Sequence, residues 1–327
     1  MGDAHESMKC KICTNSEKKG LLLAREMYFG SEEVFKYFEC PACGCLQIID
    51  PPSDMKKAYP PDYDPFKKVK YRQDCNFIKA ALGKKKDRFA LFEKGITGRL
   101  INAAFVKDSL FDLMGNAHVS TNSRILEVGC GAGNLLDYLH DLGFTDLTGI
   151  DPYAPAHTGS GVKILSKTIK ELADSGKFDL IVFSHSFEHL QDQLVTLRKV
   201  SALLSKNGVC LIRMPVKTEY IWKLYGTNWV GLDAPRHMTI HTVKSFELLL
   251  ARTDLTLERT IFDSGTDQFI GSEQYASGIP LTSEKSYYVD PRKSIFNAQR
   301  IRVFKKLARQ LNEAEQGDQA TFFLRKK

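Results

Sequence analysis

Short apolar runs alternate with amphipathic stretches along most of the chain after residue 120. Ile125–Val128 is the first run, and Leu147–Pro152 and Val162–Ser166 follow it. The segments Lys177–Phe183 and Gly208–Pro215 each hold a continuous apolar run. Runs of this kind are typical of parallel strands that are covered on both faces, and the stretches between them have helical periodicity. The pattern predicts an α/β fold with a mostly parallel sheet.

The same alternation continues to the end of the sequence. A helix is expected over Val243–Thr253, a strand over Leu255–Ser264, a second helix over Val303–Ala314 and a last strand over Gln319–Lys327. A long insertion, "KTEYIWKLYGTNWVGLDAPRHMTIHT" (residues 217–242), precedes these elements and contains both tryptophans. Insertions at the ligand-binding edge of such sheets commonly bind substrates.

The first 120 residues follow a different pattern. "GLLLAREMYF" and "VFKYFEC" have strand-like composition and predict a small hairpin within residues 1–50. The stretch "IIDPPSDMKKAYPPDYDPF" is rich in Pro, Asp and Tyr and predicts an extended linker. Helical periodicity resumes over Arg72–Asn116, for example at Leu100, Ile101 and Phe105. We therefore expect a small module at 1–50, a linker with cap helices at 51–120, and the α/β domain at 121–327.

Four cysteines in the small module have the spacing of a metal site. They form two C-x-x-C pairs, Cys10/Cys13 and Cys40/Cys43. Two such pairs are typical of a structural, tetrahedral zinc site, and a segment too small to bury much core needs that extra stability. A redox pair or disulfides are the alternatives, and no thioredoxin-like pattern surrounds either pair. Cys45 is a spare thiol that could replace one ligand.

Composition and charge limit the classes of protein to which this sequence can belong. The chain has 327 residues, of which 43% are hydrophobic and 26% charged, as in soluble globular proteins. No apolar run approaches the length of a transmembrane helix and the N-terminus lacks an apolar signal core, so we expect a cytoplasmic protein. The net charge is +7; the segment Lys56–Lys107 has 14 Lys/Arg and 5 Asp/Glu, a charge of +9, so the rest of the chain is slightly acidic. That segment is either a solvated helix face or a surface for phosphates.

A glycine loop follows the first strand of the α/β domain. Gly129, Gly131 and Gly133 form G-x-G-x-G, and Glu127 precedes the loop by two residues. A strand, a glycine turn and a helix form the anion-binding geometry of doubly wound folds. The third glycine of the dinucleotide fingerprint would fall at Asn134 and is absent. Asp151 ends the next strand, where an acid can bind both hydroxyls of a ribose.

These motifs resemble class I S-adenosylmethionine-dependent methyltransferases that carry an N-terminal zinc-binding module. The resemblance rests on the cysteine pairs, "LEVGCGAGNLL", "FDLIVFSHSFEHL" and "DAPRHMTIHT", and it covers nearly the whole chain. It implies a Rossmann-like seven-stranded sheet with an antiparallel last strand and a zinc-ribbon-like module. It also implies that Glu127, the three glycines, Asp151 and Ser184 bind S-adenosylmethionine. Such proteins are often associated with nucleotide-sugar and surface-glycan biosynthesis.

The sequence "HSFEH" raises a second possibility. His185, Glu188 and His189 spell H-x-x-E-H, which is also a metalloprotease signature. That signature lies within a helix, whereas Ser184–Ser186 is expected to be a loop at the carboxyl end of a strand, where α/β sheets bind ligands. We therefore assign His185 to the methyltransferase site. Relatives that bind a divalent metal in this Glu–His region provide a further role for Glu188 and His189.

Methyl transfer to a hydroxyl needs a group that takes its proton, and histidine titrates in the useful range. His185 and His237 are the candidate catalytic groups, and His237 could instead bind the acceptor. The candidate acceptor-binding residues are Trp229, Asp233, Arg236 and His241. A sugar hydroxyl, nucleotide-linked or glycan-linked, is the expected acceptor. The alternatives are an RNA, bound by the zinc module and the basic segment, another small acceptor such as a phenol, and a scaffold that only binds the cofactor. The sequence does not indicate the oligomeric state.

Overall fold

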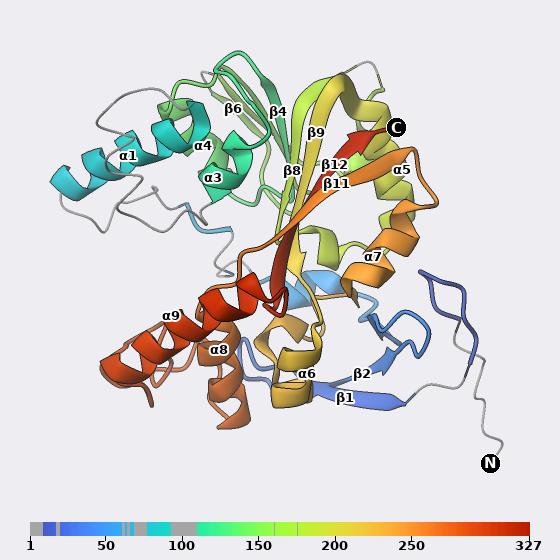
Figure 1. Ribbon diagram of the computed structural model, residues 1–327, viewed down its shortest axis with the longest axis vertical. Helices are drawn as coiled ribbons and strands as arrows, with labels where there is room; N and C mark the ends of the chain where they lie inside the picture. Colours follow the sequence, from blue (N-terminus) through green and yellow to red (C-terminus); the bar gives the residue numbers. More distant parts are fainter. Residues whose placement is uncertain are drawn as a thin grey trace.

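The computed structural model describes residues 9–17, 20–60, 63, 66–68, 77–92, 110–159, 161–174 and 176–327. Figure 1 shows one large twisted sheet with helices on both faces, and a smaller sheet below it near the N-terminus. The large sheet has the strand order β11-β12-β9-β8-β4-β5-β7-β6. Within the described part of the chain, no helix is both long and apolar enough to cross a membrane.

Seven of the strands match the predicted sheet. The parallel strands are β4 (Arg124–Val128), β5 (Asp146–Ile150), β7 (Val162–Leu165), β8 (Phe178–Ser184) and β9 (Leu204–Pro215). The last strand, β12 (Gln319–Lys326), is antiparallel to both β9 and β11 (Leu255–Phe262). The mostly parallel sheet with an antiparallel last strand is therefore confirmed.

The sheet has eight strands and not seven. The additional strand, β6 (His157–Gly159), pairs antiparallel with β7 at the edge. All three of its residues are exposed and none is apolar, so the sequence offers no periodic signal for it.

Side chains of the central strands point alternately into two separate cores. Leu126 and Ile181 face one core, whereas Ile125 and Leu180 face the other. Helices α5 (Gln193–Leu203) and α7 (Val243–Leu250) cover the first face, and α3 (Leu110–Gly115) and α4 (Asn134–Asp141) cover the second. Both faces of the strands are buried, which explains why their sequences read as continuous apolar runs.

The small sheet has the order β1-β2-β3-β10. Strands β1 (Leu21–Arg25), β2 (Val34–Glu39) and β3 (Leu46–Ile48) form an antiparallel meander, so the predicted hairpin is confirmed. The fourth strand, β10 (Thr239–Ile240), comes from the long insertion and pairs antiparallel with β3. We call residues 9–50 the cysteine module. One strand of the α/β domain completes its sheet.

The remaining elements lie beside these two sheets. Those of the linker and cap region are η1 (Met55–Ala58) and α1 (Phe77–Phe92), while Leu100, Ile101 and Phe105 lie outside the described residues. The short 3₁₀ helices of the α/β domain are η3 (Ile169–Glu171), η4 (Phe187–His189), η5 (Gly226–Asn228) and η6 (Val230–Leu232). Helices α6 (Glu219–Tyr225), α8 (Asp267–Ala276) and α9 (Ala298–Glu313) lie on the same side of the large sheet as the cysteine module (Figure 1). A third core joins them to the module.

Candidate active site

The glycine loop lies at the carboxyl end of β4. Gly129, Gly131 and Gly133 have φ of 76°, 51° and 76°, in the left-handed region that other residues rarely adopt. A Cβ atom on Gly129 would lie 2.4 Å from Cβ of Ser186, and one on Gly133 would lie 2.7 Å from Cδ1 of Ile164. Gly133 is also the N-cap of α4. Conformation and packing therefore both require glycine here.

Two carboxylates flank this loop. Oδ2 of Asp151 accepts a hydrogen bond from the Gly131 amide at 3.0 Å, and its Oδ1 accepts one from the Tyr153 amide at 2.8 Å. Glu127 is buried, and its Oε2 has no hydrogen-bond partner among the described residues. Burial, reinforced by the charge of Asp151, raises the pKa of Glu127 to about 8. A buried carboxylate oxygen without a partner fits a site for a cationic cofactor.

A cavity of about 440 Å³ opens beside the loop, a usual size for a small-molecule site. Gly129, Asp151, His185, Ser186 and His189 line one side of it. Aromatic rings from the linker and from the turn after β5 line the other side: Tyr59, Tyr63, Phe66 and Tyr153. The Tyr59 and Tyr153 rings are stacked, with centroids 5.3 Å apart.

Three side chains beside the cavity converge in a way that suits a metal ion. Ligand atoms of Glu188, His189 and His237 all lie within 4.8 Å of one another. Nδ1 of His237 lies 2.8 Å from the Gly231 carbonyl oxygen, and Nδ1 of His189 lies 3.0 Å from that of Arg236. A carbonyl only accepts, so each Nδ1 carries a proton, and the lone pair of each neutral imidazole is then on Nε2. Carbonyl bonds of this kind orient metal-binding histidines.

Glu188 has no exposed surface, and neither of its oxygens has a hydrogen-bond partner in the described part of the chain. Its Oε1 lies 3.8 Å from Nε2 of His237. Burial opposes ionisation, but the imidazoles of His185, His189 and His237 outweigh it and hold the pKa of Glu188 at about 2. Burial also lowers the pKa of His189 to about 4, so that imidazole is neutral at pH 7. A buried carboxylate beside two imidazoles fits a divalent cation.

His185 also lies near this carboxylate, with its Nδ1 3.7 Å from Oε1 of Glu188, but it has a further partner. Its φ is 53°, and its side chain is 43% exposed. Nη1 of Arg213 lies 3.1 Å from Nε2 of His185, and Nε of Arg213 lies 2.5 Å from Oδ2 of Asp263. A guanidinium only donates, so the Nε2 lone pair of His185 is already engaged. Sequence reasoning missed Arg213, although it is the one charged residue in the otherwise apolar "GVCLIRMP".

The long insertion buries most of its candidate residues. Trp229 is fully buried and donates from Nε1 to Oδ2 of Asp318 at 2.9 Å. His241 is also fully buried, with Nδ1 2.9 Å from Oγ of Ser245 and Nε2 2.8 Å from Oε1 of Gln193. Neither residue lines the cavity. Their polar atoms have partners inside the protein, and this the sequence could not reveal.

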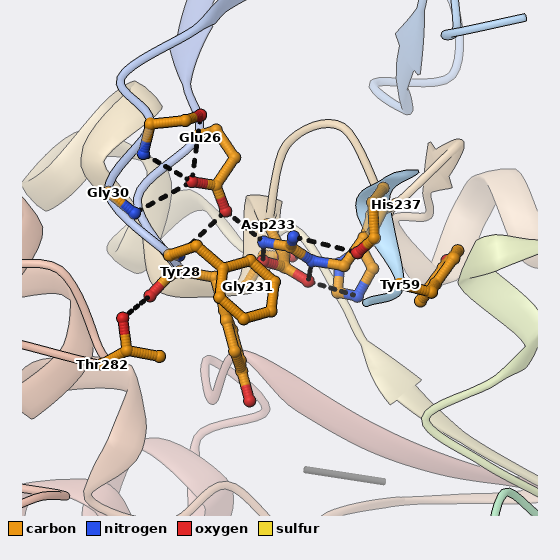
Figure 2. A network of polar contacts seen from close by, with 12 residues as sticks. Glu26, Tyr28, Gly30, Tyr59, Gly231, Asp233, His237 and Thr282 are labelled. Carbon is orange, nitrogen blue, oxygen red and sulfur yellow. Dashed lines mark hydrogen bonds and ion pairs between the residues drawn. The ribbon is translucent and has the colours of Figure 1, made fainter. Parts of the chain in front are cut away.

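Asp233 and Arg236 form a buried ion pair. Nε and Nη2 of Arg236 donate to the two oxygens of Asp233 at 2.8 and 2.6 Å. Nη2 also donates to Oε1 of Glu26, in the cysteine module, at 2.9 Å. Figure 2 shows Glu26, Asp233 and His237 in one connected network. Neither Asp233 nor Arg236 lines the cavity.

The cysteine pairs meet as predicted. Sγ atoms of Cys10, Cys13, Cys40 and Cys43 all lie within 4.8 Å of one another. The Cys10–Cys43 and Cys13–Cys40 distances are 3.8 and 3.4 Å, near the roughly 3.8 Å between thiolates on a tetrahedral zinc ion. Cys45 lies 3.4 Å from Cys43 and 3.7 Å from Cys10. Its Sγ accepts a hydrogen bond from Gln47 at 3.0 Å.

A family of methyltransferase domains matches residues 78–260, more than half of the chain. The chain belongs to this family. The glycine loop, Asp151 and the cavity fit S-adenosylmethionine as the cofactor of this domain.

Relatives of the chain include a ubiquinone biosynthesis O-methyltransferase of Azorhizobium caulinodans. It is 31% identical over 152 residues, which are 42% of this chain and 60% of that protein. An enzyme of the same name from Bartonella bacilliformis is 32% identical over 120 residues, covering 34% and 47%. The chain thus spans roughly half of each relative's length. An S-adenosylmethionine-dependent methyltransferase structure from Mesorhizobium loti has a TM-score of 0.40 and 15% identity, covering 72% of this chain and 99% of that one. These relatives do not support the expected sugar and glycan group.

The methyltransferase therefore brings together only some of the predicted residues. Gly129, Asp151 and His185 line the cavity. Five other predicted residues are not among the lining residues: Glu127, Gly131, Gly133, Ser184 and His237. Ser186, two positions after Ser184, does line it. Ser186 donates to the Val128 carbonyl at 2.6 Å, which ties the end of β8 to the glycine loop.

Proposed function

We propose that the methyltransferase methylates a hydroxyl group of a small molecule, and that Glu188, His189 and His237 activate that hydroxyl. The observation that carries the proposal is the buried Glu188 carboxylate, which has no hydrogen-bond partner among the described residues and lies beside the imidazoles of His189 and His237. Of these three residues, His189 lines the cavity. A divalent cation held by these three residues would lower the pKa of an acceptor hydroxyl. His237 then serves as a ligand and not as a free base.

The chain's own residues supply binding and alignment. The glycine loop brings its backbone close to the cofactor, Asp151 offers a carboxylate to the ribose, and Glu127 offers its free oxygen to a cationic group. S-adenosylmethionine supplies an activated methyl group when bound. Holding an acceptor in line with that group accounts for about 7–11 kcal/mol of the barrier. Because Arg213 occupies Nε2 of His185, we place His185 in the wall of the site.

The acceptor we favour is an aromatic hydroxyl. Four aromatic rings of the cavity wall, described above, suit a planar acceptor, and the relatives are named for ubiquinone biosynthesis. A sugar hydroxyl is the second candidate, because Lys167 at the cavity could meet the phosphate of a nucleotide sugar. We further propose that the four paired cysteines hold a structural zinc ion, with Cys45 outside the ligand set.

The test uses labelled methyl transfer to two acceptor panels, simple phenols and nucleotide sugars. Glu188→Gln keeps the shape of the side chain and removes its charge. Glu258→Gln is the matched control, because Glu258 pairs with Arg325 at the surface. We expect transfer to a phenol, loss of transfer in Glu188→Gln and after chelation, and full activity in Glu258→Gln. Equal turnover of Glu188→Gln and the native protein would refute the role of the cluster. Transfer to nucleotide sugars alone would show that the acceptor is a sugar hydroxyl and not an aromatic one.

A further inference from the structure

The cysteine module contacts the chain on both sides of His237. The Tyr37 hydroxyl, on β2, donates to the carbonyl oxygen of His237 at 2.9 Å. One residue later, the carbonyl of Met238 accepts a hydrogen bond from the Ile48 amide of β3 at 3.1 Å. The next two residues form β10, which pairs with β3. The module therefore fixes the backbone from residue 237 to residue 240.

The opposite side of this segment is fixed by the cluster itself. The Met238 amide donates to the carbonyl oxygen of Glu188 at 2.9 Å. His237 thus lies in a segment clamped between the cysteine module and the Glu188 turn. Tyr37 is fully buried, so its hydroxyl has no competing solvent.

A second connection runs through buried charges. Glu26, just after β1, accepts hydrogen bonds from the backbone amides of Phe29, Gly30 and Ser31 at 3.0–3.1 Å. The same carboxylate accepts the Arg236 guanidinium at 2.9 Å. Figure 2 shows this carboxylate facing the segment that carries Asp233 and His237. These donors, together with the Ser31 hydroxyl at 3.3 Å, hold the Glu26 carboxyl group in place.

The Arg236 guanidinium connects Glu26 to Asp233, in the turn before His237. Both oxygens of Asp233 accept from Arg236, and the backbone of Asp233 is left-handed, with φ of 34°. The Asp233 carbonyl accepts from the amides of Arg236 and His237 at 2.9 and 3.3 Å. Arg236 also packs over the Tyr28 ring, 4.8 Å from its centroid. The position of the His237 backbone thus depends on Glu26, 211 residues away in sequence.

We propose that the cysteine module is part of the active site, and that Glu26 and Tyr37 are positioning residues for His237. This inference rests on the proposed function, because the position of His237 affects turnover only if His237 takes part in the reaction. The module contributes no atom to the cavity lining. Its role is to hold the turn so that Nδ1 of His237 faces the Gly231 carbonyl and Nε2 faces Glu188.

The test compares three variants of the zinc-loaded protein. Glu26→Gln removes the charge that holds Arg236, and Tyr37→Phe removes only one hydroxyl and keeps the ring. Glu39→Gln is the matched control, since Glu39 also joins the module to the α/β domain, through Lys217 at 2.8 Å, but makes no contact with the Arg236 network among the described residues. The readout is the tautomer of His237 in long-range proton–nitrogen spectra of histidine-labelled protein, with His237→Gln to assign the signal. Turnover, cofactor affinity, zinc content and the melting curve are measured alongside.

We expect Glu26→Gln and Tyr37→Phe to disturb the Nδ1–H tautomer of His237 and to lower turnover by about 10²-fold, the effect of a misplacement of about 1 Å. Cofactor affinity and zinc content should stay unchanged, and Glu39→Gln should behave like the native protein. An unaltered His237 signal in folded Glu26→Gln and Tyr37→Phe would overturn the inference. A changed signal with full turnover would keep the positioning role and refute the proposed function of His237 instead.

Discussion

Replacing Glu127 with Gln should stabilise the methyltransferase at neutral pH and weaken its hold on the cofactor. The side chain is 6% exposed, and its Oε2 has no partner among the described residues. Burial, together with the charge of Asp151, raises its pKa from 4.5 to about 8. The site therefore carries a carboxylate that the protein alone would keep protonated. Functional sites often contain groups that lower the stability of the folded protein because ligand binding needs them.

The size of the effect follows from linkage. The unfolded chain ionises Glu127 near 4.5 and the folded chain near 8, so the unfolded chain binds fewer protons between these values. Stability therefore falls as the pH rises through this window, and is flat outside it. At about 1.36 kcal/mol per pH unit, the loss is roughly 1 kcal/mol at pH 5 and roughly 3 at pH 7. It approaches about 4 kcal/mol at pH 8. Gln carries no charge and avoids this loss.

Urea unfolding of both proteins between pH 5 and pH 8 measures the difference. The advantage of the variant should widen as the pH rises, while Glu258→Gln should show no such trend. Calorimetry should show that the native protein releases a proton on cofactor binding near pH 7, because a cationic cofactor favours the ionised carboxylate, and that the variant does not. A stability gap that stays constant with pH would refute the burial argument. Unchanged cofactor affinity would remove Glu127 from the site.

Three further substitutions test the cofactor site, the proposed cation site and the cysteine module. Gly131→Val should abolish cofactor binding, measured by calorimetry, because β-branched residues avoid the φ of 51° found at this position. The melting curve should stay cooperative. Unchanged cofactor affinity in a folded variant would show that the cofactor binds elsewhere. His237→Ala should remove one of the three proposed cation ligands and lower turnover by at least about 10-fold with cofactor affinity retained, and full activity would remove His237 from the mechanism. Cys40→Ser should lose bound zinc, measured by metal analysis, and with it the cooperative unfolding of the module; full zinc content would point to Cys45 as a ligand.

Local patterns in the sequence predicted the sheet and the glycine loop well. Apolar runs revealed the central strands because both of their faces are buried. The glycine loop could be recognised because Gly129, Gly131 and Gly133 all have a left-handed φ that other residues rarely adopt. Strand β6 and helix α8 were missed. The first is too short and polar to show a period, and the polar residues of α8 that are buried obscure its apolar face.

Side-chain direction could not be read from the sequence. Trp229 and His241 have residue types that suit a binding site, but both point into the protein and pair with Asp318 and with Ser245 and Gln193. Glu26 gave no signal at all, since its partner Arg236 lies 210 residues further along the chain. The two-residue strand β10, which brings these distant segments together, is below the length at which alternation can be recognised.

The most direct test of the central claim offers S-adenosylmethionine with a labelled methyl group to two pools. One is a small-molecule extract that contains phenols and nucleotide sugars, and the other is total RNA. We expect label on a hydroxyl of a compound in the small-molecule pool, and no label when Glu188 is replaced by Gln. Label in the RNA pool alone, or equal labelling by the Glu188→Gln variant, would contradict it.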